Sequence, residues 1–146
     1  MDTQVSGITP ERICQQAQAN LTTVVLGTLA YLNEQGLSRE EWTTFIGRRL
    51  TGNWEELRAP GARAILERIA LNLLTPGAEL HSLTGDASQA TATFGGWLPI
   101  AGLDLFGLTQ PEADSFADLF RPIVEHLGFH YERTEAGEYL QIRVWR

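Results

Sequence analysis

The spacing of apolar residues changes partway along this chain of 146 residues, and this change limits the fold more than any other feature. Over residues 10–74 the apolar residues recur every three or four positions, which is the period of helices packed on one side. From residue 78 onward several short stretches alternate apolar and polar residues, which is the period of half-buried strands. Helices followed by paired strands predict a single α+β domain over residues 1–146.

Three helices are expected in the first half of the chain. The first begins at Pro10, with Thr9 able to cap it. The second begins after Ser38, which can form a capping box with Glu41, and the third covers about residues 60–74. The side chains expected to face the core from the second helix are Trp42, Phe45, Ile46 and Leu50. The first helix is expected to be buried on more than one side, because its apolar face is wide: Cys14, Ala17, Leu21, Val24, Val25, Leu29 and Leu32, with Leu26, Ala30 and Tyr31 beside them.

Two β-hairpins with one helix between them are expected in the second half. The strands are residues 78–83 with 89–95, and residues 129–134 with 138–145. Thr109 and Glu112 form a capping box that starts the helix, and Pro122 should kink it by freeing the carbonyl of Asp118. The two hairpins can join into one four-stranded antiparallel sheet covered by helices on one face.

Residues 95–108 connect the first hairpin to this helix and are too apolar for an ordinary loop. Four glycines and a proline argue against one regular element. The segment nevertheless carries large apolar side chains at seven positions, namely Trp97, Leu98, Ile100, Leu103, Leu105, Phe106 and Leu108. Because loops normally keep their backbone groups in water, the segment is expected to fold over something apolar. The sequence leaves three choices: the core of the domain, a bound small molecule or a second copy of the chain.

The composition excludes several classes of chemistry. All 11 basic residues are arginine, so Schiff bases, lysine general bases and a P-loop lysine are ruled out. A net charge of −7 with no basic run disfavours nucleic-acid binding. The polar, acidic start is unlike a signal peptide, and the most apolar stretch, residues 21–32, is shorter than the ~20 residues that a bilayer crossing requires. A cytoplasmic protein without a membrane span is therefore expected.

The element order resembles the ligand-binding fold shared by vinyl-reductase-type domains, heme nitric-oxide sensors and Golgi transport particle subunits. Bacterial proteins similar to aminothiazoline-carboxylate hydrolase use the same layout. The resemblance covers most of the chain and is carried by its closing part: a helix, the strand from Phe129 to Arg133, the turn at Gly137 and the final strand. It implies an apolar pocket between helices and sheet, and often a dimer. The cysteines expected near the terminal hairpin are missing from residues 132–144, which speaks against the metal or thiol chemistry of those families here, and no functional residue carries over.

Candidate polar sites are few. His126 lies on the last turn of a helix, where a cation is favoured by the helix dipole. His130 and Glu132 share one face of a strand and, with His81 and Asp86, make at most a diffuse metal-ligand set, so no metal site is assigned. The lone cysteine, Cys14, is interpreted as a small core residue rather than a nucleophile, and no catalytic residue is assigned.

The aromatic residues are a better indication. Trp42 is expected in the core, whereas Trp54 and Trp97 lie in or beside irregular segments and Trp145 lies on the outward face of the last strand. Aromatic side chains in such places line small-molecule pockets or anchor interfaces. The predicted ligand site lies under residues 95–108 and consists of Trp54, His81, Trp97, Leu98, Phe106, Phe116 and Phe120.

Three functions remain open from the sequence. The first is a domain that binds an apolar or aromatic small molecule, as a sensor or carrier, with no cofactor identified. The second is a homodimeric interaction protein that buries residues 95–108, or the face formed by Tyr139, Arg143 and Trp145, against its copy. The third is a hydrolase of the aminothiazoline-carboxylate type, which lacks an evident pair of nucleophile and base.

Overall fold

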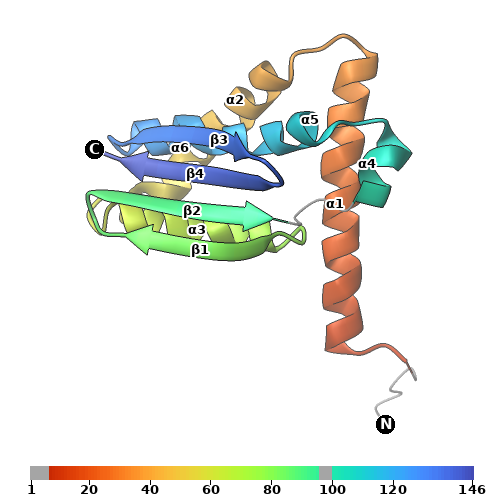
Figure 1. Cartoon of the computed structure of the whole chain (residues 1–146), viewed down its shortest axis with the longest axis horizontal. Coiled ribbons are helices and arrows are strands. Elements are labelled where there is room, and N and C mark those ends of the chain that lie inside the picture. Colours follow the sequence, from red (N-terminus) through yellow and green to blue (C-terminus); the bar gives the residue numbers. More distant parts are fainter. Residues whose placement is uncertain (1–6, 96–99) are drawn as a thin grey trace.

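The computed structural model describes residues 7–95 and 100–146 (Figure 1). The first part of the chain is helical and contains α1 (Pro10–Glu34), α2 (Arg39–Leu50), the 3-10 helix η1 (Thr51–Leu57) and α3 (Ala62–Leu74). The first hairpin follows, as β1 (Glu79–Gly85) and β2 (Gln89–Gly95). Four short helical segments come next: α4 (Ile100–Phe106), α5 (Gln110–Asp114), the 3-10 helix η2 (Ser115–Leu119) and α6 (Phe120–His126). The second hairpin closes the chain, as β3 (His130–Ala136) and β4 (Tyr139–Trp145).

The two hairpins form one antiparallel sheet with the strand order β1-β2-β4-β3, which confirms the predicted α+β fold. The hairpins join through β2 and β4, where Ala92 faces Ile142. The predicted alternation also holds, because the inward residues of these two strands are buried: Ala90, Ala92, Phe94, Leu140, Ile142 and Val144. Helices α3 and α6 cover this face, and the opposite face is open (Figure 1).

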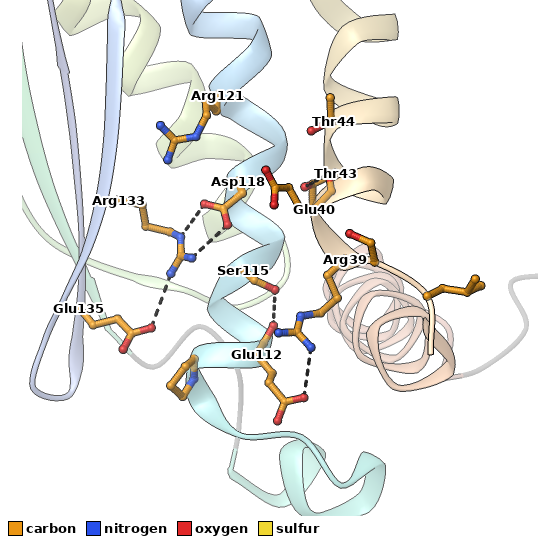
Figure 2. Close-up of a pocket in the computed structure, with 13 residues that line it drawn as sticks. Arg39, Glu40, Thr43, Thr44, Glu112, Ser115, Asp118, Arg121, Arg133 and Glu135 are labelled. Atoms are coloured by element: carbon orange, nitrogen blue, oxygen red, sulfur yellow. Dashed lines mark hydrogen bonds and ion pairs between the residues drawn. The ribbon is translucent and has the colours of Figure 1, made fainter. Parts of the chain in front are cut away.

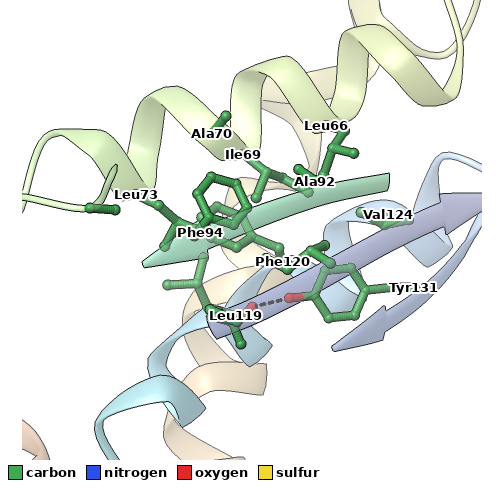
Figure 3. Close-up of a cluster of buried hydrophobic side chains, with 14 of the residues drawn as sticks. Leu66, Ile69, Ala70, Leu73, Ala92, Phe94, Leu119, Phe120, Val124 and Tyr131 are labelled. Carbon is green, nitrogen blue, oxygen red and sulfur yellow. Dashed lines mark hydrogen bonds between the residues drawn. The ribbon is translucent and has the colours of Figure 1, made fainter. Parts of the chain in front are cut away.

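The core lies between α3, α6 and the inner face of the sheet (Figure 3). Phe120 is buried at the start of α6, and its ring centre lies 5.8 Å from that of Trp54 in η1. Tyr131 is buried on β3 and donates a hydrogen bond of 2.7 Å to the carbonyl of Ala117. Burial raises the pKa of Tyr131 far above its usual value, with the nearby charge of Asp118 acting in the same direction. Its hydroxyl therefore remains a donor that ties β3 to η2.

The helix expected to kink at Pro122 changes its type before this residue. The helix starts with a complete capping box, in which Thr109 accepts from the N–H of Glu112 and Glu112 accepts from the N–H of Thr109. It then continues as 3-10 helix over Ser115–Leu119 before α6 begins. This change is expected where proline removes a backbone donor from a helix.

The expectation that the whole apolar face of α1 is buried is wrong for its first half. Residues 10–21 are exposed, and continuous burial begins only at Val25. Cys14 is exposed rather than in the core. The physical reason is that the sheet and its covering helices lie beside the middle of α1, while the first turns of the helix extend past them (Figure 1). Phe45 on α2 is likewise exposed, contrary to the prediction that it faces the core.

The sequence suggested an irregular connection over residues 95–108, but the described part of this segment contains a helix. Residues 100–106 form α4, which packs on α1 and ends before Gly107, whose φ is 64°. Leu103 and Leu108 are buried, whereas Leu105 is exposed. Gly102 allows the close approach of the two helices, because a Cβ there would lie only 3.0 Å from Leu26 Cδ1.

None of the helices within residues 7–95 and 100–146 combines the length and the apolar character that crossing a bilayer requires.

Candidate functional site

A polar groove lies where the start of α2 meets α5, η2 and β3 (Figure 2). It encloses about 640 Å³ and is open to solvent. Arg39, Glu40, Thr43 and Thr44 line it from α2; Pro111, Glu112, Ser115, Asp118 and Arg121 from α5, η2 and α6; and Arg133 and Glu135 from β3. Its size is in the range of small-molecule sites, about 300–1,000 Å³, but its lining is polar rather than aromatic.

One wall of the groove is held by a bidentate ion pair between Asp118 and Arg133. Arg133 Nε lies 2.7 Å from Asp118 Oδ1, and Arg133 Nη2 lies 3.0 Å from Asp118 Oδ2. Glu135 adds a longer ion pair of 3.6 Å to Arg133 Nη1. Burial works against the charge of Arg133, but the hydrogen-bonded Asp118 outweighs it and raises the pKa of the guanidinium. The pair holds η2 against β3.

The other wall is fixed by Glu112, which joins three helices. Its Oε1 accepts the Thr109 hydroxyl at 2.9 Å, and its Oε2 accepts from Asn33 at the end of α1 and lies 3.4 Å from Arg39 Nη1 on α2. The Thr109 hydroxyl, followed by the Thr109 N–H, Asn33 and the charge of Arg39, lowers the pKa of Glu112, while partial burial opposes this. Arg39 Nε is buried with no hydrogen-bond partner among the described residues.

The lowered pKa of Glu112 predicts a specific loss of stability in acid. A carboxyl group whose pKa is lower in the folded state stabilises the protein above its unfolded pKa, near 4.5 for Glu, and loses this contribution as the pH falls through the folded pKa. Glu112→Gln should therefore be less stable than the wild type at pH 7, and the difference should shrink below pH ~4.5. Urea unfolding at a series of pH values measures this. A difference that stays constant from pH 7 to pH 3 would contradict it, and Glu125→Gln, which changes an exposed carboxylate on α6, serves as the control.

Arg121 is the third arginine of the groove, and it contacts a backbone carbonyl and an aromatic ring rather than a carboxylate. It donates to the carbonyl of Tyr131 at 2.9 Å, and its guanidinium carbon lies 5.1 Å from the centre of the Tyr131 ring. The groove thus carries three arginines and four carboxylates, with Glu40 the fourth. Because the arginines already have partners, the groove is suited to hydrogen-bonding a polar molecule rather than to capturing an anion by bare positive charge.

The aromatic residues predicted as a ligand site are distributed over the molecule. Trp54 and Phe120 are brought together, but inside the packed core. Phe116 contacts Trp42, with ring centres 6.3 Å apart, and both are partly buried against that core. Phe106 is partly buried beside Gly27 of α1.

His81 lies on the open face of the sheet, away from these residues. Its ring centre is 4.9 Å from that of Tyr139, and Gly95 between them leaves room for the contact, because a Cβ there would come within 2.6 Å of His81 Nε2. Trp97 and Leu98 lie outside the described residues. None of the predicted residues that the structure describes lines the polar groove.

The three histidines lie on three different elements. His126, at the end of α6, is 3.0 Å from Glu55 Oε1. His130 on β3 contacts Trp145, with ring centres 5.3 Å apart, and lies on the opposite edge of the sheet from His81 on β1. Within residues 7–95 and 100–146, no three His, Cys, Asp or Glu side chains gather as a metal site would require.

A second candidate surface is an apolar stripe along the solvent side of α1, which we call the outer stripe. It consists of Ile13, Cys14, Ala17, Leu21, Val24, Thr28 and Tyr31. Val24, Tyr31 and Ile13 are 64%, 59% and 58% exposed, although the other side of the helix is buried from Val25 onward. The sequence carried a signal for it, because from Cys14 onward the stripe recurs at alternating intervals of three and four residues, which is the spacing of helix–helix interfaces.

Comparisons with known proteins give no relative for this chain. No family model, no curated protein and no solved structure matches it. The resemblance to the vinyl-reductase-type ligand-binding fold therefore stays a prediction, and function has to be argued from the groove and the outer stripe.

Proposed function

We propose that this protein is an interaction protein that acts as a homodimer, joined through the outer stripe of α1. The observation that carries the proposal is the exposure of Ile13, Val24 and Tyr31 on a helix whose opposite side is buried from Val25 onward. Each Å² of apolar surface removed from water stabilises an assembly by about 25 cal/mol. Contiguous exposed apolar surface of this kind is typical of interaction sites.

The first turns of α1 extend past the contacts that hold the rest of the helix to the domain. The hydrogen bonds that hold α1 to the end of α3 begin only at Gln18, which donates to Leu74 at 3.3 Å, and Thr22, which donates to Pro76 at 2.8 Å. The turns before Gln18 extend beyond the sheet (Figure 1). Isolated helices of fewer than about 12–15 residues are marginal in water. A neighbour packed on the outer stripe would stabilise these turns.

A second copy of the chain fits this surface better than a charged partner does. The chain has a net charge of −7, so most contacts between two copies bring like charges together. Residues 13–33 contain no charged side chain. Two copies can therefore meet along the outer stripe without burying or opposing charges, and a two-fold axis would place the same surface on both sides. This location differs from both dimer surfaces suggested by the sequence, which stay predictions.

A charge placed in the outer stripe should separate the subunits. Val24→Glu should weaken the dimer about 100-fold, which corresponds to roughly 2.7 kcal/mol, because two-fold symmetry introduces the carboxylate twice. Size-exclusion chromatography with light scattering measures the change. Gln15→Glu is the matched control, since it adds the same charge to an exposed position on the side of α1 away from the stripe. Equal dimer fractions in both variants would contradict the proposal.

Small-molecule binding is the second candidate, and the groove supports it through one observation. Arg39 Nε is buried at the groove without a hydrogen-bond partner among the described residues, so a polar ligand could supply an acceptor there. A rise in melting temperature with a panel of small carboxylates and amides would support this function, and unchanged melting would count against it. The apolar ligand expected under residues 95–108, and the hydrolase alternative, stay predictions.

A further inference from the structure

We infer that the two α1 helices pair antiparallel, in a register that places Leu21 of one copy opposite Val24 of the other. The inference rests on the proposed homodimer and adds the orientation of its subunits. In this register, the residue numbers of any two side chains that face each other across the two helices add up to 45. It therefore also pairs Ala17 with Thr28, and Cys14 with Tyr31.

The spacing of the outer stripe sets which pairings are possible. Cys14, Ala17, Leu21, Val24, Thr28 and Tyr31 follow the intervals 3, 4, 3, 4 and 3, so they form the a and d positions of a heptad repeat along most of α1. Side chains at these positions pack against those of a partner helix, and each packed pair forms one layer along the helix axis. This holds for parallel and for antiparallel helices. The choice between the two directions therefore depends on which side chains share a layer.

Side-chain size favours the antiparallel direction. In a parallel pair each residue meets its own copy, so two small Ala17 side chains would share a layer near one end and two Tyr31 rings would share a layer near the other. The first layer would leave a void and the second would be crowded. The antiparallel register matches the small Cys14 with the large Tyr31, and Ala17 with the larger Thr28, so side-chain volume varies less from layer to layer than in a parallel pair. Even filling of this kind is what close-packed interiors require.

The position of the domain body on α1 favours the same direction. The domain body is hydrogen-bonded to α1 at Gln18 and Thr22 and buries one side of the helix from Val25 onward, while the first turns extend beyond the sheet (Figure 1). Antiparallel pairing lays these turns against the second half of the partner's helix, which its own domain holds in place. Parallel pairing would leave both sets of turns together, away from both domains. Antiparallel packing also sets the two helix dipoles in opposite directions.

Disulfide trapping with the native Cys14 tests the register. In the inferred pair, Cys14 of the two copies is offset by 17 residues along the helices, which is about 25 Å at 1.5 Å per residue. A disulfide needs Cα atoms within about 7 Å. Under mild oxidation with oxidised glutathione, the wild type should therefore stay uncrosslinked, whereas Tyr31→Cys should form a covalent dimer with Cys14 of the partner. Cys14→Ser combined with Tyr31→Cys should abolish that product.

Further variants keep the test decisive if Tyr31 is needed for dimerisation. In a Cys14→Ser background, Ala17→Cys with Thr28→Cys should also give a covalent dimer, while Gln15→Cys alone reports random collisions. A crosslinked wild type would show parallel helices and overturn the inference while keeping the homodimer. Dimers by light scattering that crosslink in none of these variants would overturn the register. A monomer at every concentration would instead overturn the proposed function itself.

Discussion

Gly47→Ala should destabilise the protein by roughly 3 kcal/mol, although alanine is the better helix former. Gly47 is buried on α2 at the point where α2 crosses η2 and α6. A Cβ at this position would lie 2.2 Å from the carbonyl oxygen of Leu119 and 2.4 Å from Cγ of Pro122. One obstacle is backbone and the other is a rigid ring, so α2 has to move away from the segment that carries Asp118. The change should therefore also loosen the polar groove.

Gly52→Ala provides the matched control for this substitution. Gly52 lies in η1, a few residues further along the chain, and a Cβ there has no atom within 4 Å. The Gly52→Ala variant should be as stable as the wild type or slightly more stable, because alanine reduces the conformational freedom of the unfolded chain. Urea unfolding of both variants measures the difference. Equal stabilities would mean that α2 and η2 are not in close contact.

Phe120→Ala should cost about 3–5 kcal/mol of unfolding free energy. Phe120 is 2% exposed, packs against Trp54 and lies under the centre of the sheet with Phe94 (Figure 3). Its removal takes away an aromatic contact and leaves a cavity between α6 and α3 that rigid elements on both sides cannot close. Since natural domains are stable by only about 5–15 kcal/mol, the variant should be close to unfolding at room temperature.

Phe45→Ala is the control, because the same side chain is removed from a position on α2 that is 55% exposed. It should change the unfolding free energy by less than about 1 kcal/mol, since little apolar surface and one contact with Arg49 are lost. If Phe120→Ala does not fold, Phe120→Leu keeps the comparison measurable. A loss in Phe120→Leu no larger than in Phe45→Ala would contradict the core assigned here.

The sheet and the helix starts were predictable from the sequence because they depend on local chemistry. The alternation of β4 gives its buried face directly, since side chains in a strand point to opposite sides in turn. Thr109 with Glu112 marks a helix start by satisfying free backbone amides, and the structure contains both bonds. Pro122 marks the interruption of its helix for the same kind of reason.

The surroundings of α1 could not be predicted in this way. A helical period shows that a face is apolar, but it does not show whether the same chain or another molecule covers it. Cys14 and Val24 fit the periodic pattern as well as Val25 does, yet the first two are exposed and the third is buried. Cys14 is exposed because the domain body does not extend along the first turns of α1, and Val24 is exposed because it faces away from the domain on which Val25 packs. Both depend on how the distant hairpins and helices pack.

The groove was missed because its residues come from segments far apart in the sequence. Arg39, Asp118 and Arg133 lie on α2, η2 and β3, and no short motif relates them. Glu112 was recognised as a capping residue, but its second oxygen also binds Asn33 and Arg39, which no local pattern reveals. Conversely, aromatic residues beside irregular segments suggested a ligand site, whereas Trp54 and Phe120 serve the core.

Sedimentation equilibrium of the unmodified protein, from low to high micromolar concentration, tests the homodimer most directly. The account predicts a species of twice the 16.2 kDa chain mass that dissociates on dilution. Val24→Glu should shift the dissociation to much higher concentration, while Gln15→Glu should follow the wild type. A mass of 16.2 kDa at every concentration would contradict the account and leave the outer stripe of α1 without a partner of its own kind.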